Sequence, residues 1–217
     1  MSDLAAWLGA TLGEAQPLYR GGPPRVARLA LALEPSDVPE EISADALFLH
    51  RARRLGDRHG GLGVLSVHDG FDAQLTTGPN LRLARALNWT DVQQVTFEGK
   101  LVGISATPPQ TSWAALHRAL NAELGGEDAA WPPAERDSLR LALMNAMNPS
   151  LIHHVADLGV RVYLTGQLRP SATAAARARG LGVVALGHRR SELWGLHQLA
   201  TELRAAFPGL ETEVYPA

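Results

Sequence analysis

Short apolar runs alternate with segments of helical spacing along most of the chain. Runs typical of strands occupy residues 25–34, 44–50, 62–68, 92–106 (two strands with a turn at 98–100), 161–164, 182–186 and 211–215. Helical spacing covers residues 51–59, 80–87, 111–124, 152–158, 170–179 and 191–207, with a further short helix around residues 5–8. Strands and helices that alternate at this spacing predict an α/β fold with mainly parallel pairing.

Three segments between these elements are less regular. Residues 69–72, Asp-Gly-Phe-Asp, are expected to form a loop, and residues 138–147 fit either a strand or a helix. Residues 125–133 are polar and contain Pro and Gly, so we expect an exposed loop or a junction between two lobes there.

Composition and charge narrow the class of protein. The 217 residues carry 20 basic and 22 acidic side chains, a formal net charge of −2, which gives no strong signal for nucleic acid or an anionic membrane. The chain has no cysteine, so any metal would need His, Asp, Glu or water as ligands. The first residues lack a basic leader, and no apolar run approaches the ~20 residues that cross a bilayer. We therefore expect a cytoplasmic protein.

Histidines follow three of the predicted strands, and two of them are paired with a carboxylate four residues later. His50 ends the run 44–50, His68 precedes Asp72, and His188 precedes Glu192. Parallel strands place ligands at their carboxyl ends, and residues four apart share one face of a helix. A single histidine at a strand end is most often satisfied by hydrogen bonds, but the repetition at three strand ends favours a metal site. Imidazole and carboxylate together suit Zn, Mn, Fe or Ni.

Other candidates carry less weight. Residues 165–167, Thr-Gly-Gln, follow a strand and fit equally well an anion site at a helix start and an ordinary turn. The remaining histidines are expected on helices or loops, as exposed, capping or packing residues: His59, His117, His153, His154 and His197. The chain has no Walker phosphate loop, no Gly-x-Gly-x-x-Gly and no Gly-x-Ser-x-Gly.

Four segments, in this order, resemble the NGG-interacting-factor-three-like family, the dinuclear-metal-centre proteins known as homologues of a type 2 GTP cyclohydrolase. The segments are LFLHR (46–51), SVHDGFD (66–72) followed by NLRLAR (80–85), VYLTGQ (162–167) and ALGHRRSE (185–192). The resemblance implies two similar α/β lobes with mainly parallel or mixed sheets facing a metal-lined cleft, and a hexamer. We expect the lobes to cover about residues 1–110 and 111–217.

The resemblance also implies a ligand set. It falls on His50, Asp72, His188 and Glu192, with His68 as a further ligand or a catalytic proton shuttle. The family usually has two adjacent histidines where this chain has His50-Arg51, and an arginine cannot ligate a cation. The expected number of divalent metal ions is therefore one or two per chain.

Three functions are compatible with these residues. The first is a metal-dependent hydrolase, and the resemblance implies a GTP cyclohydrolase type of activity on a purine nucleotide. The second is a non-catalytic metal-binding or regulatory hexamer that uses the cleft for a partner. The third is a degenerate member in which Arg51 replaces the charge of a metal and the cleft binds phosphate or a nucleotide.

Overall fold

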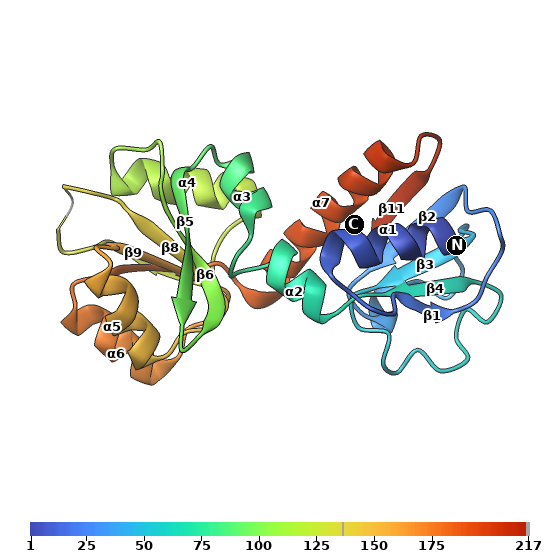
Figure 1. The fold of residues 1–217 in the computed structure, drawn as a ribbon, viewed down its shortest axis with the longest axis horizontal. Coiled ribbons are helices and arrows are strands. Elements are labelled where there is room, and N and C mark those ends of the chain that lie inside the picture. The colour runs from blue at the N-terminus through green and yellow to red at the C-terminus, as the bar shows by residue number, and fades with distance from the viewer. Residues whose placement is uncertain (136, 216–217) are drawn as a thin grey trace. The chain divides into compact units, whose positions relative to one another are not determined.

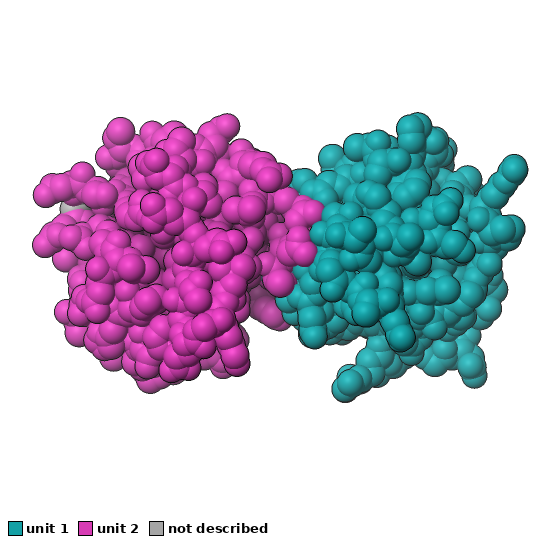
Figure 2. Space-filling view, in the orientation of Figure 1, with its two compact units in different colours: residues 1–72, 195–217 teal, residues 73–194 magenta. Residues whose placement is uncertain are grey.

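The computed structural model describes residues 1–135 and 137–215, and the chain divides into two compact units. Unit 1 contains residues 1–72 and 195–217, and unit 2 contains residues 73–194, as coloured in Figure 2. The division differs from the lobes expected around residue 110, because the strands between residues 90 and 107 pair with strands of the C-terminal half of the chain. Each unit has its own mixed sheet, so the predicted α/β class is confirmed.

The sheet of unit 1 has four parallel strands and one antiparallel edge strand (Figure 1). Its order is β1 (Leu18–Arg20), β4 (Gly63–Ser66), β3 (Ala46–Leu49), β2 (Arg28–Ala32) and β11 (Glu211–Tyr215). All four residues of β3 are buried, as expected for a central strand covered on both faces. The carboxyl ends of β2, β3 and β4 therefore lie along the same edge of the sheet.

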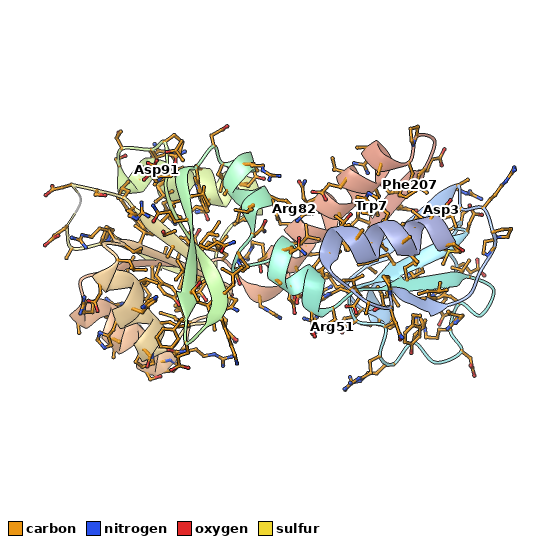
Figure 3. The ribbon with its side chains drawn as sticks, in the orientation of Figure 1. Asp3, Trp7, Arg51, Arg82, Asp91 and Phe207 are labelled. Carbon is orange, nitrogen blue, oxygen red and sulfur yellow. The ribbon has the colours of Figure 1, made fainter. Side chains whose placement is uncertain are left out.

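Helix α1 (Ser2–Leu12) packs in unit 1 through one apolar stripe. Leu4, Leu8 and Leu12 are buried at a spacing of four residues, which places them on one face. Trp7 meets Phe207 edge to face with ring centroids 6.1 Å apart, and both are labelled in Figure 3. Phe207 follows α7 (His188–Ala206), a helix whose first residues belong to unit 2 and whose last residues belong to unit 1.

The sheet of unit 2 is mixed. Its order is β5 (Thr90–Phe97), β6 (Lys100–Thr107), β8 (Leu141–Met144), β9 (Val162–Thr165), β10 (Gly182–Ala185) and β7 (Ala129–Trp131). Strands β8, β9 and β10 are parallel, whereas the outer strands pair antiparallel. The choice between strand and helix at 138–147 is thus decided in favour of a strand.

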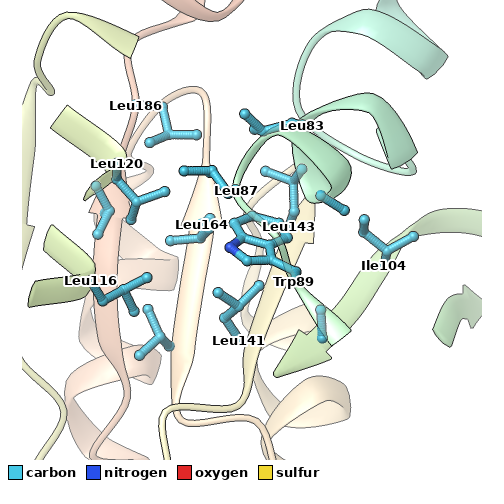
Figure 4. Packing of buried hydrophobic residues seen from close by; sticks show 14 of the residues in the cluster. Leu83, Leu87, Trp89, Ile104, Leu116, Leu120, Leu141, Leu143, Leu164 and Leu186 are labelled. Atoms are coloured by element: carbon cyan, nitrogen blue, oxygen red, sulfur yellow. The ribbon is translucent and has the colours of Figure 1, made fainter. Parts of the chain in front are cut away.

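Helices cover both faces of this sheet, as Figure 1 shows. The helices are α3 (Leu81–Ala86), α4 (Trp113–Leu124), α5 (Pro149–Asp157) and α6 (Pro170–Ala178). Leu141 and Leu143 face the cluster formed with α3 and α4, part of which is drawn in Figure 4. Ala142 and Met144, the alternate residues of the same strand, face the cluster formed with α5 and α6. The period of two along β8 therefore separates two apolar layers.

Three local predictions are corrected. Residues 51–59 form turns rather than a helix, because only Ala52 and Leu55 are buried and both Arg54 and Gly56 have positive φ. The expected loop at 69–72 is instead the first turn of α2 (Asp69–Leu75). The expected loop or junction at 125–133 contains β7, which forms one edge of the second sheet.

In the described part of the chain, no helix combines the length and apolar character that a membrane span requires.

Candidate metal centre

Two of the predicted histidines lie at neighbouring strand ends in unit 1. His50 directly follows β3, and His68 comes two residues after the end of β4. These strands pair in parallel, with Leu49 opposite Ser66, so their carboxyl ends meet at one edge of the sheet. The strand-end position that the sequence predicted for both residues is the one that the fold uses.

The ring of His50 is buried and is held by a hydrogen bond at Nδ1. Nδ1 lies 3.2 Å from the carbonyl oxygen of Val67, and Nε2 lies 3.3 Å from Oδ1 of Asp72. A carbonyl oxygen can only accept, so Nδ1 carries the proton in this hydrogen bond and Nε2 presents its lone pair to Asp72 in the neutral ring. Phe71 packs beside the ring with a centroid distance of 4.5 Å. This is the tautomer that a metal-ligating histidine uses through Nε2.

Asp72 owes its position to the first turn of α2. Its backbone N–H donates to the carbonyl oxygen of His68 at 2.9 Å, which brings residues 68 and 72 onto one side of the turn. Gly70 allows α2 to approach the end of α1, since a Cβ at this position would lie 2.0 Å from the carbonyl oxygen of Leu12. A close backbone contact of α1 and α2 thus sets where the carboxylate of Asp72 points.

His68 completes a group of three donors. Its Nε2 lies 3.7 Å from Oδ2 of Asp72, and its ring stacks on His50 with centroids 4.9 Å apart and an interplanar angle of 10°. Its Nδ1 forms a 2.7 Å hydrogen bond with Oδ1 of Asp69. Asp69 was not among the predicted site residues. Its position directly after a strand-end histidine is the sequence signal that could have found it.

The spacing of these donors fits a single cation. One ligand atom from each of His50, His68 and Asp72 lies within 4.8 Å of the other two. Metal–ligand bonds of about 2.0–2.2 Å in a tetrahedron separate the donors by about 3.3–3.6 Å. Nε2 of His50 lies 3.3 Å from Oδ1 of Asp72, and Nε2 of His68 lies 3.7 Å from Oδ2 of the same carboxylate. The group can therefore hold a divalent metal with a small adjustment, and three protein ligands would leave a position for water or substrate.

The other two predicted ligands form their own pair in unit 2. His188 begins α7, and its Nε2 lies 3.0 Å from Oε1 of Glu192, one turn later. The side chain of Glu192 is only 2% exposed, whereas that of His188 is 62% exposed. Gly187, with φ of 86°, ends the strand segment and turns the chain into the helix. The predicted four-residue pairing is present, and the pair belongs to a different unit from His50, His68 and Asp72.

The weaker sequence candidates have ordinary structural surroundings. The carbonyl oxygen of Thr165, the last residue of β9, accepts the N–H of Leu186 at 2.8 Å, so the pairing of β9 with β10 continues one residue past the end of β10. His117 pairs with Glu127 at 2.8 Å, and His154 packs edge to face on Phe97 with centroids 5.2 Å apart.

A pocket in unit 1 opens beside two of the three donors, His50 and His68. It has a volume of about 430 Å³ and is lined by Tyr19, Arg51, Arg53 and Ser66 together with His50 and His68. Tyr19 lies on the edge strand β1 and is 54% exposed. A small molecule in this pocket would meet both imidazoles and two guanidinium groups.

The fold and this site define an α/β protein with a His-His-Asp group that can hold a metal ion. The sequence profile of Duf34/NIF3 (NGG1p interacting factor 3) matches residues 57–217, which is most of the chain. The protein therefore belongs to the Duf34/NIF3 family, and the resemblance inferred from the four segments is confirmed.

Curated relatives carry the name GTP cyclohydrolase 1 type 2 homolog. The protein from Pseudomonas aeruginosa is 27% identical over 215 residues, covering 86% of this chain and 82% of the relative. The protein from Allochromatium vinosum is 27% identical over 148 residues, covering 68% of this chain. That alignment spans 58% of the length of the Allochromatium protein.

Solved structures share the fold. Protein ybgI, described as of unknown function, superposes with a TM-score of 0.76 at 19% identity, covering 98% of this chain and 96% of that one. Reduced HcgD from Methanocaldococcus jannaschii superposes with a TM-score of 0.73 at 20% identity, covering 100% and 96%. At this level of identity the likeness concerns the fold alone.

Proposed function

We propose that this protein is a metal-dependent hydrolase of the Duf34/NIF3 family. The observation that carries the proposal is the convergence of His50, His68 and Asp72, whose donor atoms lie within 4.8 Å of one another at the carboxyl edge of a parallel sheet. A divalent ion supplies, when bound, a Lewis acid that activates water for attack on carbon or phosphorus. The candidates are Zn, Mn, Fe and Ni, because nitrogen and carboxylate oxygen donors suit all four.

The protein groups would have separate tasks. His50 is the rigid ligand, because its ring is buried and its Nδ1 is hydrogen-bonded to Val67. Asp72 balances the charge of the ion and faces both imidazoles. His68 is half-exposed and backed by Asp69, so it can either bind the ion or carry a proton between the site and solvent.

The resemblance extends the ligand set to His188 and Glu192. The burial of Glu192 beside the Nε2 of His188 supports a role for this pair, because a buried carboxylate is costly unless it is paired or coordinates a cation. The names of the curated relatives support a purine nucleotide as substrate. The family resemblance supports a homo-oligomer, with a hexamer as the expected assembly.

Metal stoichiometry tests the proposal. The full-length protein is reconstituted with Zn²⁺ or Mn²⁺, dialysed, and analysed for metal per chain. We expect one or two ions in the wild type, loss of at least one in His50→Ala and in Asp72→Asn, and no change in His153→Ala, which removes an exposed histidine of α5. A wild type that retains no metal, or a His50→Ala variant that retains all of it, would contradict the proposal.

The contribution of the second pair is measured in the same way. If Glu192 is a ligand, Glu192→Gln lowers the metal content, and if it only packs inside unit 2, the content is unchanged. GTP turnover by the metal-loaded wild type then separates the hydrolase from a non-catalytic metal-binding protein, for which metal is retained and no product forms.

Arg51 gives a further prediction about stoichiometry. The family usually has a second histidine there, and a guanidinium repels a cation rather than binding it. We expect Arg51→His to raise the number of ions per chain, as measured by elemental analysis. An unchanged number would show that Arg51 does not limit the metal content.

A further inference from the structure

The loop between β3 and β4 combines two buried anchors with four arginines. Ala52 and Leu55 are 3% and 1% exposed, and a hydrogen bond of 3.0 Å from the N–H of Leu55 to the carbonyl of Ala52 closes a turn between them. The N–H of Arg51 donates to the carbonyl of Leu33 at 2.8 Å, which extends the pairing beyond β2. Ala52 and Leu55 thus pack into the core of unit 1. The arginines of the same loop line a pocket: Arg51, Arg53, Arg54 and Arg58.

These four side chains surround one pocket of about 440 Å³. Glu34 is the acidic residue in its lining, so the formal charge of the lining is four minus one, or +3. The whole chain, in contrast, has a net charge of −2. In the described part of the chain, neither Arg53 nor Arg54 forms an ion pair. Such a concentration of guanidinium groups is favourable only near an anion or in contact with solvent.

Several contacts hold the pocket in shape before any ligand binds. Arg58 donates from Nη1 to the carbonyl of Pro35 at 3.0 Å, and Arg51 pairs with Glu34 at 3.2 Å. Arg20 reaches across from β1 and donates to the carbonyls of Gly56 and His59, both at 2.9 Å. Burial, and to a lesser extent the positive charges of Arg58 and Arg20, lowers the pKa of His59, so the neutral form of this histidine is favoured.

We propose that this arginine pocket binds the phosphate group of a phosphorylated small molecule. Guanidinium groups match the oxygens of phosphate in pairs, and a lining charge of +3 suits a dianion better than a single carboxylate. Arg51 and Arg53 also line the neighbouring pocket that contains His50 and His68. A molecule with its phosphate on the arginines would therefore extend toward the metal donors, and this orientation of the molecule, unlike phosphate binding itself, rests on the proposed hydrolase.

Calorimetric titration of the full-length protein tests the pocket. Metal is first removed with EDTA and dialysis, so that a metal ion does not contribute to anion binding. The probes are inorganic phosphate, ribose 5-phosphate and GMP, with ribose as the ligand without phosphate. The variant is Arg53→Gln with Arg54→Gln, and the matched control is Arg118→Gln, which removes an exposed arginine of α4 in unit 2.

We expect the phosphorylated probes to bind the wild type and the control equally, and the double variant about 10- to 100-fold more weakly, because it loses charge-assisted hydrogen bonds to phosphate. Raising the salt concentration should weaken the binding. Equal affinities of GMP and ribose 5-phosphate would identify the phosphate as the recognised part, and tighter GMP binding would add the base as a second contact.

The failure of this inference differs from the failure of the proposed function. If the double variant binds phosphate as well as the wild type does, the arginine pocket is not the site, whatever its metal content. If the wild type holds no metal but loses phosphate affinity in the double variant, the pocket stands as an anion site and the metal-dependent hydrolase is wrong. Circular dichroism of the double variant, expected to match the wild type, shows that a loss of affinity does not come from misfolding.

Discussion

His50 and His68 differ in what surrounds them, and this decides how each can act. The ring of His50 is buried between Phe71 and the ring of His68, and its Nδ1 is committed to the carbonyl of Val67. Its Nε2 is thus directed at Asp72 with little freedom to rotate. His68 is half-exposed, and its Nδ1 is bonded to a carboxylate rather than to a backbone carbonyl. A carboxylate in this position fixes the tautomer of the ring and orients the other ring nitrogen.

The contact of Asp69 with His68 gives a prediction at this scale. Asp69→Asn removes the negative charge that contacts Nδ1 of His68. We expect the affinity for Zn²⁺ to fall about 10- to 100-fold, because the carboxylate orients the imidazole for binding. The thermal midpoint without metal should change little, because the side chain of Asp69 is 97% exposed. Competition with a chromophoric chelator measures the affinity.

Asp3→Asn is the matched control for this variant, since Asp3 is also an exposed carboxylate in the first turn of a helix of unit 1. Equal Zn²⁺ affinities in Asp69→Asn and Asp3→Asn would show that His68 does not bind the metal through an Asp69-supported nitrogen.

At the scale of elements, the site depends on the pairing of β2, β3 and β4 and on the docking of α2. Asp45, just before β3, accepts hydrogen bonds from the N–H groups of Ala27 and Arg28, both at 2.8 Å. Its own N–H donates to the carbonyl of Arg28 at 2.9 Å, next to the pair formed by Leu29 and Ala46. Asp45 therefore secures the register of β3, the strand that ends at His50.

The hydrogen bonds from Arg28 and Ala27 lower the pKa of the Asp45 carboxyl, which predicts a pH dependence of stability. A carboxylate with a lowered pKa in the folded state stabilises the fold above its unfolded pKa of about 3.9, and this contribution is lost as the pH falls through the folded value. Asp45→Asn should reduce the free energy of unfolding by about 1 kcal/mol at pH 7. The difference from the wild type should persist at pH 5 and shrink below about pH 4.

Urea unfolding at several pH values measures this difference. The exposed Asp57→Asn should stay within about 0.5 kcal/mol of the wild type at pH 7. An Asp45→Asn deficit of the same size at pH 3 and pH 7 would mean that the charge of Asp45 is not what stabilises the register.

The contact of α2 with α1 gives a second prediction for elements. Gly70→Ala would place a Cβ 2.0 Å from the carbonyl oxygen of Leu12, so α2 must shift and carry Asp72 with it. We expect a loss of about 1–3 kcal/mol in the free energy of unfolding together with weaker Zn²⁺ binding. Gly21→Ala is the control, because a Cβ at Gly21 would meet nothing within 4 Å. Unchanged stability and metal affinity in Gly70→Ala would show that the contact is easily relieved.

The whole molecule consists of two units, each with a sheet and an apolar core of its own. Unfolding of such a chain need not be a single two-state transition. The three donors of the candidate metal centre all belong to unit 1. A ligand that binds only the folded form of a unit stabilises that unit through mass action.

Hydrogen exchange with and without Zn²⁺ tests this linkage across the molecule. We expect added protection in residues 46–72, where the donors lie, and little change in β8 and β9 of unit 2. Gained protection around residues 186–193 would add His188 and Glu192 to the ligand set. The Asp72→Asn variant should show neither effect, and uniform protection over both units would contradict a local site.

The pattern of apolar residues by itself predicted the α/β class, the strands that carry the site, and the strand-end positions of His50, His68 and His188. It could do so because a strand buried on both faces appears in the sequence as a continuous apolar run. Two segments were predicted wrongly: residues 51–59, expected as a helix, form turns, and residues 69–72, expected as a loop, form the first turn of α2. Only the tertiary structure showed that donor atoms of His50, His68 and Asp72 lie within 4.8 Å of one another, that Asp69 contacts His68, and that four arginines line one pocket. The physical reason is that these distances depend on the β3–β4 register and on the packing of α2 against α1. Both are contacts between residues far apart in the sequence, and such contacts produce no repeating pattern of apolar residues from which they could be predicted.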